Sequence, residues 1–136
     1  MGSLGPINEE KKRIDEILHL AGLQERPNTP THELSGGWRQ RLALGCAVLH
    51  EPKIVFLDEP TGGVDPVTRR QFWNLIYEAT QAGITVFVTT HYMDEAEYCD
   101  RVSIMVDGRI AALDKPGLLI RQFEAETMND VFLKLA

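Results

Sequence analysis

Two adjacent carboxylates, Asp58 and Glu59, directly follow a short apolar run and are the residues of this chain best placed to do chemistry. The run, residues 54–57, is too short for an ordinary helix. Its β-branched and aromatic side chains, set between Pro52 and Pro60, predict a strand buried on both faces, as in a parallel sheet. The last side chains of such a strand emerge at the carboxyl edge of the sheet, where open α/β folds bind ligands.

Adjacent acids at such an edge repel one another unless a cation lies between them or their roles differ. In a nucleotide-hydrolysing site, Asp58 would hold Mg²⁺, directly or through water, while Glu59 would orient and deprotonate the attacking water. The alternative is a strand that simply ends in a solvated acidic turn. These residues alone do not decide between the two interpretations.

A second candidate site is the segment Ser35-Gly36-Gly37. Serine caps helices, paired glycines let the backbone approach an anion, and a helix predicted for residues 38–50 would direct its free N–H groups and positive dipole end at this point. The segment therefore predicts a phosphate site, and the alternative is an ordinary serine-capped helix with a glycine hinge. This helix is expected to stop before Pro52 and to bury Leu42, Leu44, Ala47, Val48 and Leu49.

Asp65 is predicted to cap a further helix, which carries Pro66 in its first turn and ends at Gly83. Trp73 and Tyr77 are expected to be packing residues of this helix rather than ligand stackers. Its inner face is predicted to consist of Phe72, Leu75, Ile76 and Ala79.

Residues 84–88 predict a second buried strand. Thr89, Thr90 and His91 would then emerge at the same carboxyl edge as Asp58. At the end of a buried parallel strand beside an acidic site, His91 is a candidate sensor that donates a hydrogen bond to a γ-phosphate.

The remaining segments predict supporting elements. Residues 8–21 form an amphipathic helix with Asn8 as its cap and Gly22 as its stop, and residues 24–33 form an exposed connection. A short helix at residues 93–98 carries Asp94, Glu95 and Glu97, interpreted as dipole partners and a solvated face rather than a metal site. Residues 102–106 and 110–113 form a hairpin at Asp107-Gly108, followed by a small helix after Lys115 and a last amphipathic helix at 128–135.

Composition narrows the class of protein. A chain of 136 residues with 43% apolar content is one modest domain, and its net charge of −6 argues against an electrostatic nucleic-acid binder. Cys46 and Cys99 lie far apart and indicate neither a disulfide framework nor a zinc site, which fits a reduced cytosolic compartment. No apolar segment approaches the roughly 20 residues of a membrane helix, so we expect any membrane role to act through a partner chain.

Four motifs in order resemble the ATP-binding cassette (ABC) ATPases. Residues 34–38, LSGGW, resemble the family signature, and residues 54–59, IVFLDE, resemble the Walker B strand with its catalytic glutamate. Residues 62–65 match the D-loop and His91 the switch histidine. The run after His91 is similar to the transporter branch, and within it to bacterial multidrug-type exporters. Trp38 departs from the signature, whose fifth residue is commonly Gln.

The resemblance implies an α/β, P-loop NTPase fold that is present in part. A parallel sheet core with flanking helices would follow a remnant of the helical subdomain and precede a C-terminal hairpin and helices. Within a partial nucleotide-binding domain at 1–136, residues 8–50 would hold the end of the helical subdomain and the signature helix. Residues 51–114 would form the Walker B, D-loop and switch-histidine core, and residues 115–136 the C-terminal helices.

The resemblance also implies ATP and Mg²⁺ as cofactors. Glu59 and His91 would be catalytic and Asp58 would bind the metal, whereas the nucleotide contacts would come from Ser35, Gly36, Gly37 and Asp65. In the family two domains face head to tail, and the signature of one closes on ATP held by the other. A membrane-spanning permease converts this closure into transport, which implies a peripheral place on the cytoplasmic face of the membrane.

The sequence contains no GxxxxGK[ST] loop, so the resemblance implies that the phosphate cradle lies before residue 1 and that this is the C-terminal half of the domain. Because phosphoryl transfer relies on that cradle, we expect negligible ATPase activity from the chain alone. Unpaired sheet edges favour self-association. Two alternatives stay open: a non-catalytic interaction fragment or gene remnant, and an ABC protein that acts on the ribosome or on nucleic acid.

Overall fold

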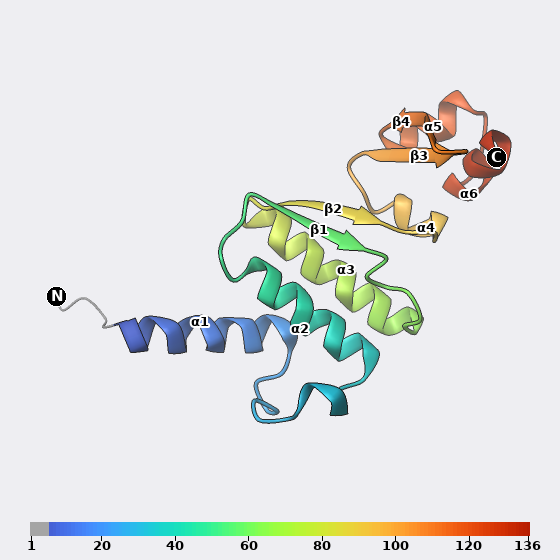
Figure 1. The fold of residues 1–136 in the computed structure, drawn as a ribbon. Helices are drawn as coiled ribbons and strands as arrows, with labels where there is room; N and C mark the ends of the chain where they lie inside the picture. Colours follow the sequence, from blue (N-terminus) through green and yellow to red (C-terminus); the bar gives the residue numbers. More distant parts are fainter. Residues whose placement is uncertain (1–5) are drawn as a thin grey trace. The chain divides into compact units, whose positions relative to one another are not determined.

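The computed structural model describes residues 6–136, which fall into two compact units, one ending at Thr89 and the other beginning at Thr90. Each unit is described by itself. The first contains α1 (Pro6–Ala21), the 3-10 helix η1 (Thr31–Glu33), α2 (Gly36–Val48), β1 (Ile54–Asp58), α3 (Pro66–Gln81) and β2 (Thr85–Thr89) (Figure 1). The second contains α4 (Met93–Ala96), β3 (Val102–Val106), β4 (Arg109–Asp114), α5 (Pro116–Gln122) and α6 (Met128–Leu135).

Helix α1 is longer than the sequence predicts, because it begins at Pro6 and not after Asn8. Asn8 therefore lies inside the first turns, and its predicted role as the cap is wrong. The predicted stop is confirmed, since Gly22 adopts a φ of 69°, the left-handed conformation that ends helices at low cost. Ala21 is fully buried at the end that packs on α2, whereas Ile7 near the start is 81% exposed.

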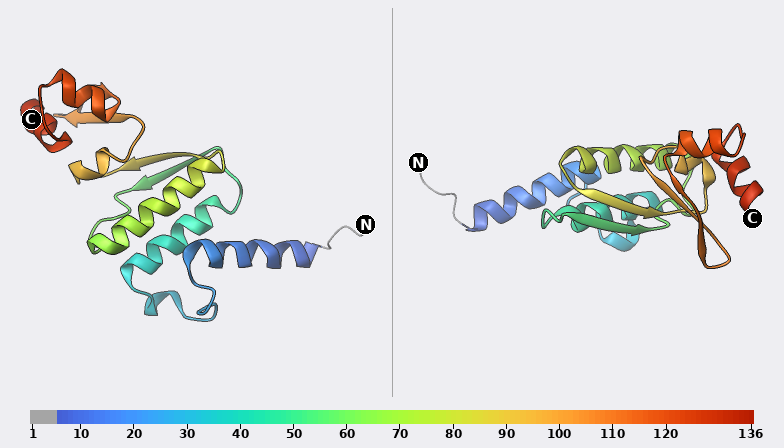
Figure 2. Two further views of the ribbon diagram at one scale, coloured as in Figure 1. Left: turned by 180° about the vertical axis from the view of Figure 1, so that it is seen from behind. Right: turned by 90° about the horizontal axis from the view of Figure 1, so that it is seen from above.

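Helices α2 and α3 lie side by side, with their first turns at the same end (Figures 1 and 2). Leu44 is buried as predicted, but Ala47 is exposed, so the predicted burial of that face is only partly right. Helix α3 largely confirms its predicted inner face, because Phe72, Ile76 and Ala79 are buried and Leu75 is half-buried. Trp73 is buried too and lies against the Tyr77 ring, which confirms the packing interpretation for Trp73, whereas Tyr77 is exposed.

Strands β1 and β2 pair in parallel, with Phe56 opposite Phe87 and Asp58 opposite Thr89. The prediction of strands buried on both faces is wrong in this structure: Val55 is 5% exposed, but Phe56 is 70% and Phe87 53% exposed. The physical reason is that α3 packs on one face of the pair, while the face that carries the two Phe rings is open to solvent in the described part of the chain.

The second unit is organised around a hairpin. Strands β3 and β4 are antiparallel, and Asp107 and Gly108 both have positive φ, at 49° and 73°, as the predicted two-residue turn requires. The hairpin, α4, α5 and α6 bury a core that consists of Ala96, Ile104, Leu119, Met128 and Val131. Helix α6 begins with a reciprocal capping box between Thr127 and Asp130.

Candidate functional site

The two predicted acids occupy the carboxyl end of β1. Asp58 is the last residue of the strand, and its Oδ1 accepts a hydrogen bond of 2.5 Å from the Thr89 hydroxyl on β2. The parallel register sets these two residues opposite one another. The hydrogen bond from this hydroxyl holds the carboxylate in one orientation, which suits an oxygen ligand for a hard cation.

Glu59 follows with a left-handed backbone, at a φ of 44°. Its amide donates to the Thr89 carbonyl at 3.0 Å and lies 3.1 Å from the Thr89 hydroxyl, so the ladder between the strands continues for one residue beyond β1. A bulky residue in this conformation is uncommon and costs of order 1 kcal/mol. Asp58 and Glu59 thus differ in backbone conformation, because Asp58 ends the strand and Glu59 is left-handed.

The signature segment forms the start of α2. Ser35 is the N-cap residue, but its side chain makes no cap hydrogen bond, so the predicted capping geometry is confirmed only in the backbone. Ser35 and Gly36 are exposed, while Gly37 is buried. Since the first amides of a helix lack intrahelical partners, this exposed turn offers N–H groups toward solvent.

Asp65 caps α3 as predicted. One carboxylate oxygen accepts from the Thr68 amide at 2.9 Å and the other from the Thr68 hydroxyl at 2.5 Å, with Pro66 in the first turn. The hydrogen bonds from Thr68 lower the pKa of the exposed Asp65 carboxyl, chiefly the one from its side chain. Asp65 is therefore held ionised beside the start of α2.

His91 lies in the second unit, so the structure does not place it relative to Asp58 and the predicted common edge remains a prediction. The His91 ring is exposed and lies 4.2 Å from the Tyr92 ring, measured between centroids.

The interpretation of the α4 acids as a solvated face is wrong for Glu95, which is completely buried and accepts a 2.7 Å hydrogen bond from the Thr90 hydroxyl. The Glu97 carboxylate accepts from the Met128 amide at 3.2 Å and so joins α4 to α6.

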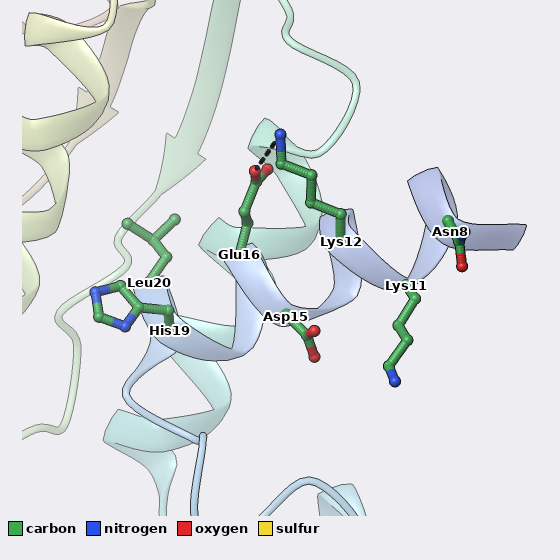
Figure 3. Close-up of a pocket in the computed structure, with 7 residues that line it drawn as sticks. All are labelled: Asn8, Lys11, Lys12, Asp15, Glu16, His19 and Leu20. Atoms are coloured by element: carbon green, nitrogen blue, oxygen red, sulfur yellow. Dashed lines mark ion pairs between the residues drawn. The ribbon is translucent and has the colours of Figure 1, made fainter. Parts of the chain in front are cut away.

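A surface hollow of about 630 Å³ runs along α1 (Figure 3). Its seven lining residues all come from this one helix and include none of the predicted site residues. Within the hollow, Lys12 Nζ and Glu16 Oε1 form an exposed ion pair 3.9 Å apart. Exposed pairs of this kind contribute little free energy. The hollow is the side of a helix, not a cleft that elements enclose, and it carries no site.

The described residues offer few ligands for a metal ion. Across residues 6–136, no cluster of three or more His, Cys, Asp or Glu side chains is arranged to hold an ion. A magnesium ion bound with nucleotide needs only one or two protein carboxylates, because phosphate oxygens and waters complete its shell. Asp58 with its Thr89 partner fits that requirement.

Sequence reasoning missed the contributions of Thr89, Thr68 and Glu95. Thr89 lies opposite Asp58 and holds its carboxylate. The sequence indicated this contact, because it places a hydroxyl residue, Thr89, at the end of the neighbouring predicted strand. Thr68 at the third position after Asp65 fits a side chain that donates to the cap, which local spacing also indicates. No local signal distinguishes the buried Glu95 from Asp94 beside it.

Comparison with known proteins agrees with this geometry. The family described as "ABC transporter" matches residues 4–62. A curated relative from Escherichia coli (strain K12), the probable multidrug ABC transporter ATP-binding protein YbhF, is 46% identical over 131 residues, covering 93% of this chain and 23% of YbhF. The chain is similar to the ATP-binding proteins of ABC transporters. It spans less than a quarter of the length of this relative.

Solved structures of ABC ATP-binding subunits have a similar fold. An ATP-binding subunit of an ABC transporter is 27% identical, with a TM-score of 0.78 over 98% of this chain and 56% of that one. A bacterial ABC transporter cassette, described as dimeric, is 33% identical, with a TM-score of 0.70 over 85% of this chain and 50% of that one. The chain therefore has a partial P-loop NTPase fold of the ABC type, and the predicted family and fold class are confirmed.

Members of the ABC family bind ATP through domains of this kind. Among residues 6–136, no helix is both long and apolar enough to cross a membrane. The predicted division into residues 8–50, 51–114 and 115–136 stays a prediction.

Proposed function

We propose that this chain forms part of the ATP-binding subunit of an ABC-type exporter, in which ATP binding and hydrolysis drive transport through a permease. The observation that carries the proposal is the end of the parallel pair, where the Thr89 hydroxyl holds Asp58 and Glu59 follows directly with a left-handed backbone. The name of YbhF, a probable multidrug ABC transporter ATP-binding protein, supports the exporter class.

Each acid has one role in this proposal. Asp58 binds the Mg²⁺ that accompanies ATP, and Glu59 accepts a proton from the attacking water and orients it. Bound MgATP supplies the phosphoryl group and the positive charge that neutralises its oxygens. His91 donates a hydrogen bond to the γ-phosphate.

The signature segment acts in trans. Ser35, Gly36 and Gly37, with the amides at the start of α2, contact ATP held by a second ABC domain, and Asp65 lies at the same interface. A solved relative described as dimeric supports a head-to-tail pair. The complex is peripheral on the cytoplasmic face of the membrane, attached through the permease, and nucleic acid is not a partner because the chain carries a net charge of −6.

The 136 residues, which contain no GxxxxGK[ST] segment, do not hydrolyse ATP on their own in this proposal. Without a cradle, nothing positions the γ-phosphate against Glu59. The chain instead offers its signature to a domain that holds ATP in an intact phosphate loop.

The test measures MgATP hydrolysis by the purified chain, and its MgATP-dependent association with an ABC domain that has an intact phosphate loop. We expect no turnover by the chain alone and association that Ser35→Arg abolishes. Glu51→Arg, an exposed change outside the proposed interface, is the matched control and should leave association unchanged. Turnover that Glu59→Gln removes would overturn the account of the missing loop.

Two other results would contradict the exporter proposal and favour a different function. No association in any nucleotide state would favour an inactive fragment or gene remnant. Salt-sensitive binding to ribosomes or to nucleic acid, independent of Ser35, would favour the branch of ABC proteins that acts there.

A further inference from the structure

The start of α2 lies against the start of α3 where Gly37 meets Thr68. A Cβ placed on Gly37 would overlap the Thr68 Cγ2 methyl far inside van der Waals distance, while the Thr68 Cβ and Oγ1 would stay at 3.5 and 3.8 Å. The methyl group therefore occupies the space that a side chain at residue 37 would need. Gly37 is buried at this contact, whereas nothing lies within 4 Å of a Cβ at the neighbouring Gly36.

The other branch of the same Thr68 side chain is also engaged. Its hydroxyl donates to Asp65 Oδ2 at 2.5 Å, and its amide donates to Asp65 Oδ1 at 2.9 Å. One turn further along, the Arg41 guanidinium of α2 donates to the Gln71 side chain of α3, so the contact between the two helices continues beyond their first turns.

We propose that Thr68 is a positioning residue that holds the signature turn and the Asp65 turn in one fixed relation, with its methyl against Gly37 and its hydroxyl on Asp65. The two segments lie about thirty residues apart in sequence, and this side chain touches both. A Thr side chain has one strongly restricted χ1 torsion, so its methyl and hydroxyl cannot move independently. Displacement of the backbone at Gly37 therefore displaces the group that holds Asp65.

The functional meaning of this link rests on the proposed function, since Ser35 to Gly37 and Asp65 are there assigned to the same nucleotide-dependent interface. If one turn moves when a partner domain closes, Thr68 carries the movement to the other. The link itself is a property of this chain and can be tested without a partner or nucleotide.

Substitutions at the two positions separate the methyl from the hydroxyl. Gly37→Ala should force the methyl away and lower the melting temperature by about 5 °C, the effect of modest overpacking in a domain of this size. Thr68→Ser removes the methyl and keeps the hydroxyl, so Gly37→Ala should cost almost nothing in that background. Gly36→Ala is the matched control, because its added Cβ meets open space.

The decisive readout is the titration of Asp65, followed by NMR of its side-chain carboxyl carbon. Thr68→Val keeps the shape but removes the hydroxyl, and it should raise the pKa of Asp65 because the strongest hydrogen bond to the carboxylate is lost. Gly37→Ala should raise the pKa of Asp65 as well, although it changes no group that touches Asp65. The double variant Gly37→Ala/Thr68→Ser should return the pKa toward that of Thr68→Ser alone.

A purely structural contact would lower the melting temperature without moving the Asp65 titration. That result, or equal destabilisation by Gly37→Ala in both backgrounds, would overturn the positioning role. MgATP-dependent association with the intact ABC domain gives the second measurement, in which Thr68→Val should weaken binding about tenfold at unchanged stability. If the unsubstituted chain shows no such association, the proposed function fails, while the coupling at Asp65 still decides this inference.

Discussion

Two small sheets of this chain have the same number of strands but different surroundings. The antiparallel hairpin β3–β4 packs its inner face on α5 and α6, and Ile104 is 4% exposed. The parallel pair β1–β2 contacts α3 through β2 and buries Val55, but it leaves Phe56 and Phe87 open to solvent. The difference teaches that the hairpin completes its own local core, whereas the parallel pair, which bears the acids, has an apolar face that the described residues do not cover.

The first prediction concerns the completed core, where the largest effect is expected. Leu119 is 1% exposed between the hairpin and α6, so Leu119→Ala should lower the free energy of unfolding by about 2 to 5 kcal/mol. Leu118→Ala, at a neighbouring position that is 43% exposed, is the control and should cost much less. Urea unfolding measures both, and equal losses would show that the second unit has no such core.

The second prediction concerns the buried acid of the same unit. Glu95 accepts from the Thr90 hydroxyl in a completely buried setting, so Glu95→Ala should lower the free energy of unfolding by about 1 to 3 kcal/mol. Asp94→Ala, at the exposed neighbouring position, should cost far less. Chemical denaturation compares the two variants, and a neutral Glu95→Ala would mean that this side chain is solvated after all.

The third prediction is a dependence on pH. Burial, with the negative charges of Glu95 and Asp100, raises the pKa of Cys99 from its ordinary 9.0 to about 11. The folded chain thus holds this proton more tightly than the unfolded chain. The resulting stability is fully present below pH 9 and is lost as the pH rises from 9 toward 11.

Cys99→Ser should therefore flatten the fall in stability between pH 9 and 11 relative to the unsubstituted chain. Unfolding at a series of pH values measures the difference between the two proteins. Identical slopes would contradict the environment assigned to this thiol.

The last prediction has the smallest effect on stability and examines the open sheet face. Phe56 is 70% exposed, so Phe56→Thr should change the free energy of unfolding by no more than about 0.5 kcal/mol. It should, however, reduce self-association of the chain, because a large exposed ring on a paired strand favours it. Light scattering measures association, and Val67→Thr on α3, at a similarly exposed position, is the control. A large loss of stability in Phe56→Thr would show that this face is covered.

Local chemistry was predictable where neighbours in sequence make the structure. Asp65 with Pro66 specified the start of α3, Asp107-Gly108 specified the hairpin turn, and the acids at the end of β1 marked the candidate site. These features depend on backbone torsions, capping and strand ends, which a few consecutive residues control. The resemblance to the ABC family followed from short motifs, each of which consists of a few consecutive residues.

Burial and long-range partners could not be predicted in this way. Glu95 and Asp94 have the same charge and adjacent places on α4, yet only packing against the rest of the second unit decides that Glu95 is buried. Phe56 has the pattern of a buried strand, but its exposure depends on which elements cover the sheet.

The sequence by itself determined the resemblance to the ABC family, the cap of α3, the hairpin turn, and the two acids with the signature that precedes them. Only the tertiary structure decided that Thr89 holds Asp58 and that Thr68 joins Gly37 to Asp65. The physical reason is distance along the chain. Torsional preferences act between near neighbours, whereas the contacts of Thr89 with Asp58 and of Thr68 with Gly37 join residues about thirty positions apart. These two contacts exist only once strands and helices have packed.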